Sequence, residues 1–308
     1  MEISQYIKNL QVPEGPVDVV LDTDTFNEID DQFALSYLLK SGEKLNPKAF
    51  FAAPFFNHHS ASPGDGMEKS YEEILRLLQL AGREELIPRV FKGSSSYLPD
   101  EKTPVVSPAA EELIRLAASY TPERPLYVVA IGAITNVASA LIMAPEIAEK
   151  IVIVWLGGNG REWNDSNEFN LMQDIAAGRV VFGSGAPVIQ LPCSGVVSAF
   201  TVSIPELTAY FEGRNPLCDF LVKRVKDEVA SYAAGICVSR VIWDVTSIGW
   251  LLNDGDRFMK MRLAEAPVPE YDGRMAYDKD RLAGYVYHIK RDALLTDLAM
   301  KLTDGKCF

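Results

Sequence analysis

Short apolar runs alternate with stretches of helical periodicity along most of this 308-residue chain. The run at 17–21 precedes a helical period at 30–40, and the run at 126–132 precedes one at 133–150. Strands that alternate with helices connect through βαβ crossovers, which place successive strands parallel to each other. The sequence therefore predicts an α/β fold, with an open, mainly parallel twisted sheet and helices on both faces.

The connecting segments show no repeat, no low-complexity tract and no linker. We therefore expect one domain over residues 1–308. Polar loops are expected at 158–170 and 211–220, and a terminal helix at 291–302. The stretch at 266–284 is rich in turn residues, so we expect it near the active face or at a sheet edge.

Composition narrows the functional classes. The formal net charge of −12 and a pI near 4.8 argue against a nucleic-acid partner, because binding to phosphate needs a basic footprint. No signal-peptide pattern opens the chain and no run approaches the roughly 20 apolar residues that span a bilayer, so we expect a cytoplasmic protein without a membrane partner. The cysteines are scattered and lack a zinc-site spacing, which predicts reduced, mostly buried thiols at Cys193, Cys218, Cys237 and Cys307.

Four aspartates crowd the connection that leaves the first expected strand: Asp22, Asp24, Asp30 and Asp31. Ligands of open α/β sheets sit beyond the carboxyl ends of the strands, so this is a place for chemistry. Helix capping can explain Asp30 or Asp31, but it does not offset the repulsion among four carboxylates. A hard divalent cation does, and the lack of His and Cys neighbours favours calcium over zinc.

The spacing of these aspartates resembles the N-terminal fingerprint of the inosine-uridine preferring nucleoside hydrolases. Further segments in the same order resemble that family: "VVAIGAITNVASAL", "LGGN" followed by "NEFN", and "WDVTSIGWLL". The resemblance covers nearly the whole chain. It implies calcium-dependent cleavage of the N-glycosidic bond of a ribonucleoside, with no organic cofactor, by a homo-oligomer that is a dimer or a tetramer.

The resemblance also implies residue roles. Calcium would be held by the side chains of Asp24, Asp31 and Asp244 and by the main-chain carbonyl of Ile131. The ribose pocket would be formed by Asp30, Asn57, Glu168 and Asn170. Asp24 would act as general base on a metal-bound water that attacks the anomeric carbon.

The chain departs from the family pattern in two places. The first loop is two residues longer than in the family, and its Asn27 and Glu28 could read a substituent of the substrate or cap the following helix. Trp243 stands where purine-cleaving members carry a His that can protonate the leaving base, and an indole does not act as an acid near neutral pH. Trp243 could stack on the substrate or fill the core. His58 or His59 could replace the missing acid, or both could be ordinary loop residues.

The expected partner is therefore a small-molecule nucleoside or sugar glycoside. Two alternatives stay open: hydrolysis of another sugar glycoside, and a non-catalytic relative that binds calcium or sugar. The presence of Asp24 favours an enzyme, because a binding protein could lose the general base.

Overall fold

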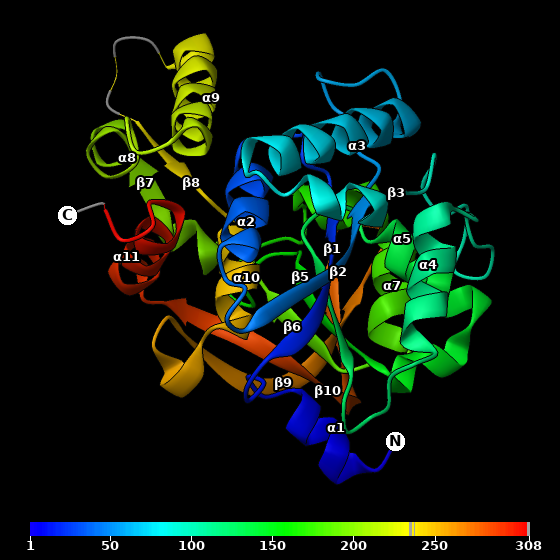
Figure 1. The fold of residues 1–308 in the computed structure, drawn as a ribbon. Coiled ribbons are helices and arrows are strands. Elements are labelled where there is room, and N and C mark those ends of the chain that lie inside the picture. The colour runs from blue at the N-terminus through cyan, green and yellow to red at the C-terminus, as the bar shows by residue number, and fades with distance from the viewer. Residues whose placement is uncertain (234–235, 237, 307–308) are drawn as a thin grey trace.

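The computed structural model describes residues 1–233, 236 and 238–306. An eight-stranded sheet, in the order β3-β2-β1-β4-β5-β6-β10-β9, forms its centre (Figure 1). The neighbouring strands are parallel except β9 and β10, which are antiparallel. The strands are β1 (Val17–Thr23), β2 (Leu45–Ala52), β3 (Val90–Lys92), β4 (Leu126–Ala130), β5 (Ile151–Leu156), β6 (Val188–Leu191), β9 (Met259–Pro269) and β10 (Met275–Ile289). A separate two-stranded sheet joins β7 (Thr201–Ser203) to β8 (Ser239–Val241).

Helices cover both faces of the sheet (Figure 1). Successive strand residues point to opposite faces, so Val19 and Leu21 enter one core and Val20 enters the other. The first core includes residues of α2, α3, α10 and α11, and the second includes residues of α4, α5 and α7. The predicted fold class is confirmed. The helices are α1 (Ile3–Asn9), α2 (Asp30–Leu39), α3 (Pro63–Leu80), α4 (Pro108–Ala117), α5 (Thr135–Met143), α6 (Phe169–Gln173), α7 (Ile175–Gly183), α8 (Ile204–Tyr210), α9 (Pro216–Tyr232), α10 (Val245–Leu251) and α11 (Arg291–Leu302).

Two segments are more regular than the sequence predicted. The stretch at 266–284 lies at the sheet edge as expected, but most of it belongs to the β9–β10 hairpin rather than to turns. The expected loop at 211–220 ends at Asn215, whose side chain accepts a hydrogen bond from Cys218 N, and helix α9 begins at Pro216. An Asn cap followed by Pro is a helix-start signal that the sequence already contained.

Helix α2 carries Asp30 and Asp31 at its first turn, and all ten of its residues are buried. The sequence predicted a helix over 30–40, and the structure shows that it is buried on all sides, because α2 lies between the sheet and the neighbouring helices. Two of its polar side chains donate to partners inside the protein: Gln32 donates to Glu73 Oε1 at 2.8 Å, and Ser36 donates to Gln32 O at 2.7 Å. A helix buried all round needs such partners, because an unpaired polar group in the core is costly.

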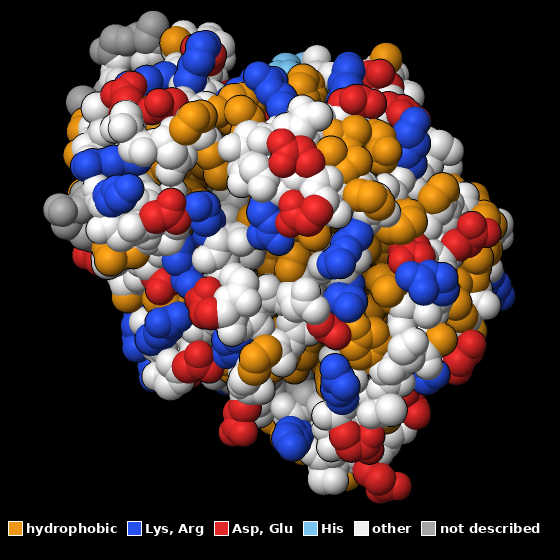
Figure 2. Space-filling view, viewed as in Figure 1, with side chains coloured by type: hydrophobic (Ala, Val, Ile, Leu, Met, Phe, Trp, Pro, Cys, Tyr) orange, Lys and Arg blue, Asp and Glu red, His pale blue; other side chains and the backbone are white. Residues whose placement is uncertain are grey.

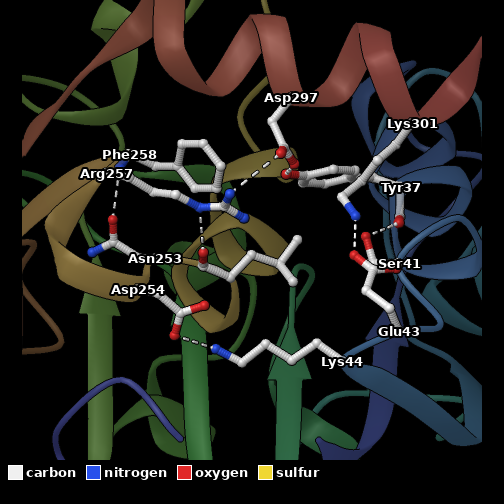
Figure 3. A network of polar contacts seen from close by, with 11 residues as sticks. Tyr37, Ser41, Glu43, Lys44, Asn253, Asp254, Arg257, Phe258, Asp297 and Lys301 are labelled. Atoms are coloured by element: carbon white, nitrogen blue, oxygen red, sulfur yellow. Dashed lines mark hydrogen bonds and ion pairs between the residues drawn. The ribbon is translucent and has the colours of Figure 1, made fainter. Parts of the chain in front are cut away.

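A polar network holds the C-terminal end of α2 (Figure 3). Tyr37, itself buried, donates its hydroxyl to Asp297 of α11. Just beyond the helix, Lys44 pairs with Asp254 at 2.6 Å, and Glu43 pairs with Lys301 of α11. These contacts tie the helix that presents Asp30 and Asp31 to the C-terminal part of the chain.

The surface shown in Figure 2 mixes acidic, basic and apolar side chains, and no continuous basic tract covers this face. None of the helices in the described part of the chain combines the length and apolar character that a bilayer crossing requires. Cys193 and Cys218 are buried free thiols, as predicted. Cys237 and Cys307 lie outside the described residues.

Candidate active site

A cavity of about 240 Å³ opens at the carboxyl ends of the central strands. Its wall includes the loop that follows β1, the segment after β4, the loop between β5 and α6, and the start of α10. These segments are far apart in sequence, and the parallel sheet brings them to one edge.

The cavity collects most of the residues that the resemblance singled out. Eight of the nine predicted site residues line it: Asp24, Asp30, Asp31, Ile131, Glu168, Asn170, Trp243 and Asp244. Asn57 does not line the cavity. Its side-chain amide instead donates to Asn27 Oδ1 at 2.6 Å, and Asn27 is a lining residue.

Three carboxylates lie close enough to share one cation. Asp30, Asp31 and Asp244 each offer an oxygen within 4.8 Å of the others, and all three are buried. Asp31 and Asp244 belong to the predicted metal set, whereas Asp30 was predicted to hold the sugar. Asp31 is oriented by Thr23, whose hydroxyl donates to Asp31 Oδ1 at 2.5 Å.

Asp24 is the least satisfied carboxylate of the site. It is fully buried, and neither of its oxygens has a hydrogen-bond partner among the described residues. Gly132 leaves room for it, because a Cβ at Gly132 would lie 3.0 Å from Asp24 Oδ1. A buried ionised group without partners is unstable, so the site calls for a cation or a proton.

The pKa values point the same way. Burial, reinforced by neighbouring carboxylates, raises the pKa of Asp24 and Asp244 well above the ordinary value. Burial and the charge of Glu28 likewise raise the pKa of Asp30, and burial raises that of Asp31 to about 6. Like charges in a buried cluster disfavour ionisation unless an opposite charge joins them. The residues present therefore fit a divalent metal ion with oxygen ligands.

Hydrogen bonds to the main chain hold the side chains of Glu168 and Asn170 in the cavity wall. Glu168 caps α6, accepting hydrogen bonds from Asn170 N at 2.9 Å, Leu171 N at 3.0 Å and Gly158 N at 2.8 Å. Asn170 Nδ2 donates to Leu156 O at 3.0 Å and to Ile131 O at 3.3 Å. These hydrogen bonds fix both side chains before a ligand arrives.

Among the described residues that line the cavity, there is no histidine to protonate a leaving base. Trp243 lines the cavity and also packs against the core, and its stacking on a substrate stays a prediction. His58 and His59 are exposed, with their ring centroids 3.8 Å apart, and neither lines the cavity. Among the described residues, no Lys, Arg or His lines it.

The sequence analysis did not identify some of the residues that line the cavity. Asn27 and Glu28 were noted only as an insertion of open role, and Cys193 as a buried thiol, yet all three line the cavity. Cys193 and Ser194 follow β6, which ends at the same sheet edge. Position after a central parallel strand was the signal that could have found them.

Comparison with known proteins agrees with this geometry. A sequence model of the family described as inosine-uridine preferring nucleoside hydrolase matches residues 19–282. The pyrimidine-specific ribonucleoside hydrolase RihA of Citrobacter koseri is 28% identical over 252 residues, covering 72% of this chain and 76% of that protein. RihA of Salmonella typhi is 29% identical over 265 residues, covering 76% and 79%.

Solved structures share the fold. A plant nucleoside hydrolase, PpNRh1, has a TM-score of 0.75 at 19% identity, covering 94% of this chain and 99% of that one. A purine-preferring ribonucleoside hydrolase from Gardnerella vaginalis has a TM-score of 0.74 at 20% identity, covering 94% and 98%. The protein is therefore a hydrolase of the nucleoside hydrolase class. It belongs to the inosine-uridine preferring nucleoside hydrolase family.

Proposed function

We propose that the protein hydrolyses the N-glycosidic bond of ribonucleosides with a bound calcium ion and with Asp24 as general base. The observation that carries the proposal is the unpartnered, fully buried carboxylate of Asp24 beside the three aspartates that can share a cation. Such an arrangement is costly in the free protein and becomes favourable when a metal and a substrate complete it.

The metal ligands that we propose are the side chains of Asp24, Asp31 and Asp244 and the carbonyl of Ile131. All of them are oxygens, and the cavity offers no imidazole among the described residues, which favours calcium over zinc. Asp30 lies close enough to Asp31 and Asp244 to contribute as well. When bound, the ion would lower the pKa of a water molecule and neutralise part of the carboxylate charge.

The side chains of the protein carry out the remaining steps of the reaction. Asp24 takes a proton from the attacking water, so that the oxygen can add to the anomeric carbon as the bond to the base breaks. The buried carboxylates stabilise the positive charge that develops on the sugar ring. Asp30, Glu168 and Asn170 hold the sugar hydroxyls, and their fixed orientation supplies part of the rate enhancement.

The leaving group is where this chain differs from purine-cleaving relatives. Trp243 offers a ring face for stacking but no titratable proton, and the two loop histidines lie outside the cavity wall. We therefore propose that the enzyme favours ribosides whose leaving group departs without strong acid assistance. The aryl group of p-nitrophenyl β-ribofuranoside is such a leaving group, whereas inosine and uridine depend more on protonation.

The test compares hydrolysis of p-nitrophenyl β-ribofuranoside, inosine and uridine by the wild type, by Asp24→Ala and by Asp18→Asn. Asp18 is the matched control, because it lies on β1, the strand that Asp24 follows, but lines a separate hollow and pairs with Tyr120 and Asn46. We expect hydrolysis by the wild type and by Asp18→Asn, and loss of at least about a thousandfold in kcat with Asp24→Ala or with EDTA. No turnover of any substrate by calcium-loaded wild type would overturn the proposal in favour of another glycoside or of a binding protein.

We also propose that the protein is a dimer or a tetramer, as the resembled family implies. Light scattering coupled to size exclusion should then give a mass two or four times the 34.0 kDa of one chain. A mass equal to that of one chain would contradict it.

A further inference from the structure

The lengthened loop between β1 and α2 forms a fixed part of the cavity wall. Asn27 lines the cavity with an exposed fraction of 7%, and its main-chain N donates to Asp24 O at 2.7 Å. The next residue, Glu28, accepts a hydrogen bond from Arg240 Nη2 at 2.5 Å, and the same guanidinium lies 3.1 Å from Glu228 of α9. The loop is thus attached at one end to the site and at the other to β8 and α9.

The orientation of the Asn27 amide follows from a chain of hydrogen bonds. The main-chain N–H of His59 can only donate, and it donates to Asn57 Oδ1 at 2.8 Å. The nitrogen of Asn57 is therefore the end that faces Asn27, and it donates to Asn27 Oδ1 at 2.6 Å. A side-chain amide has one oxygen and one NH₂ group, so this contact leaves the Nδ2 of Asn27 as its free end.

That free end has no acceptor among the residues that the structure describes. No described residue accepts a hydrogen bond from Asn27 Nδ2, and the atom is not among the enclosed polar atoms without a partner. Since the residue lines the cavity, its two amide hydrogens are available to whatever fills that cavity. Asn27 also lies three residues before Asp30 in the chain, and Asp30 is the carboxylate of this loop assigned to the sugar hydroxyls.

We propose that Asn27 binds substrate by donating a hydrogen bond from Nδ2 to a hydroxyl oxygen of the sugar, and that Asn57 is the positioning residue that holds its amide in this orientation. The inference rests on the proposed function. The resemblance implied that Asn57 contacts the sugar. We instead assign the direct contact to Asn27, which accepts the hydrogen bond from Asn57 and lines the cavity. The longer loop is then a substrate-binding element rather than a helix cap.

Steady-state kinetics with p-nitrophenyl β-ribofuranoside tests this on Asn27→Ala, Asn57→Ala, the double variant and Asn46→Ala. Asn46 is the matched control, an exposed asparagine that donates to Asp18 at 2.6 Å far from the cavity. We expect Asn27→Ala to lower kcat/KM by about tenfold, as for one neutral hydrogen bond. Asn57→Ala should cost somewhat less, and the double variant no more than Asn27→Ala alone, because both act through one contact. An unchanged kcat/KM in Asn27→Ala, or additive losses in the double variant, would overturn the proposal.

A second comparison separates binding from a purely structural effect. We would repeat the assay with the 2-, 3- and 5-deoxy analogues of the aryl riboside and compare each variant with wild type on the same substrate. The loss in Asn27→Ala should vanish on the analogue that lacks the bonded hydroxyl and persist on the other two. Equal losses on all three analogues would overturn a sugar contact.

Calorimetric binding of an iminoribitol, a ribose analogue with a charged ring nitrogen and no bond to cleave, distinguishes failure of this inference from failure of the proposed function. Wild type that binds the analogue, with Asn27→Ala binding it about tenfold more weakly, supports the inference even if turnover is slow. Equal binding by both proteins overturns the role of Asn27 and leaves the proposed function standing. Wild type that neither binds the analogue nor hydrolyses any riboside overturns both.

Discussion

At the scale of single residues, the site is defined by carboxylates that repel one another. Their position after the first strand predicted that Asp24, Asp30 and Asp31 lie at the carboxyl edge of the sheet, and the family resemblance implied that Asp244 joins them. The cavity wall contains all four. The sequence could not predict the place of Asn57, because which of two asparagines faces a cavity depends on how two loops pack. That packing is a tertiary contact between residues 30 positions apart.

Replacement of Asp244 by Asn tests the balance between repulsion and metal binding. Removing one of the clustered charges should raise the melting temperature of the EDTA-treated protein by roughly 2 to 4 °C for each kcal/mol of repulsion relieved. A ligand that binds the native state stabilises it by mass action. Wild type should therefore gain more stability from calcium than Asp244→Asn, because the variant lacks one proposed ligand and binds calcium more weakly. Thermal unfolding with and without calcium measures both effects, with Asp18→Asn as control. An equal response to calcium in wild type and variant would contradict the role of Asp244.

Cys193 should be unreactive in spite of its place in the cavity wall. Burial, followed by the negative charge of Glu168, raises the pKa of the Cys193 thiol well above its ordinary value. A raised pKa means less thiolate at pH 8, and the thiolate is the reactive form. Iodoacetamide should therefore modify Cys193 at least about tenfold more slowly in the native protein than in urea, as followed by peptide mass spectrometry. Modification at the unfolded rate would show that the thiol is open to solvent and ionised.

At the scale of elements, helix α2 connects the site to the rest of the fold. The helical spacing of its apolar residues was enough to predict a helix. It was not enough to predict burial on all sides, because the sequence of a ten-residue helix does not reveal the helices that pack over it. The β9–β10 hairpin shows the converse problem. Pro267, Pro269 and Gly273 suggested turns, yet β9 is an edge strand, where proline is tolerated because its missing N–H is not needed on the open side. Only the tip at 270–274 is a turn.

Tyr37→Phe tests how α2 is held. The substitution keeps the buried ring and removes the hydroxyl that donates to Asp297 of α11 (Figure 3). We expect a loss of about 1 to 2 kcal/mol in the free energy of unfolding by urea, with kcat little changed, because the hydrogen bond lies at the end of the helix remote from the aspartates. Tyr287→Phe, at a side chain with 46% exposure, should leave stability unchanged. Full stability in Tyr37→Phe would show that packing alone anchors the helix.

At the scale of the whole molecule, the order of the strands brings the residues of the site together. The crossovers place β1, β4, β5 and β6 side by side, so that four loops distant in sequence meet at one edge. Alternating apolar runs and helical periods were sufficient to predict this architecture, because parallel neighbours require such crossovers. The small β7–β8 sheet and the helices α8 and α9 beside it were not predicted. Their strands have three residues each, too few for a periodic signal.

The most direct measurement is a titration of metal-free protein with calcium, in which bound calcium and the rate of p-nitrophenyl β-ribofuranoside hydrolysis are followed together. If the aspartate cluster holds the catalytic ion, hydrolysis should rise from near zero in proportion to the bound calcium and reach its maximum at about one ion per chain, and Asp24→Ala should stay inactive at every calcium concentration. Full hydrolysis by the metal-free wild type, or calcium binding without any gain in rate, would contradict the account.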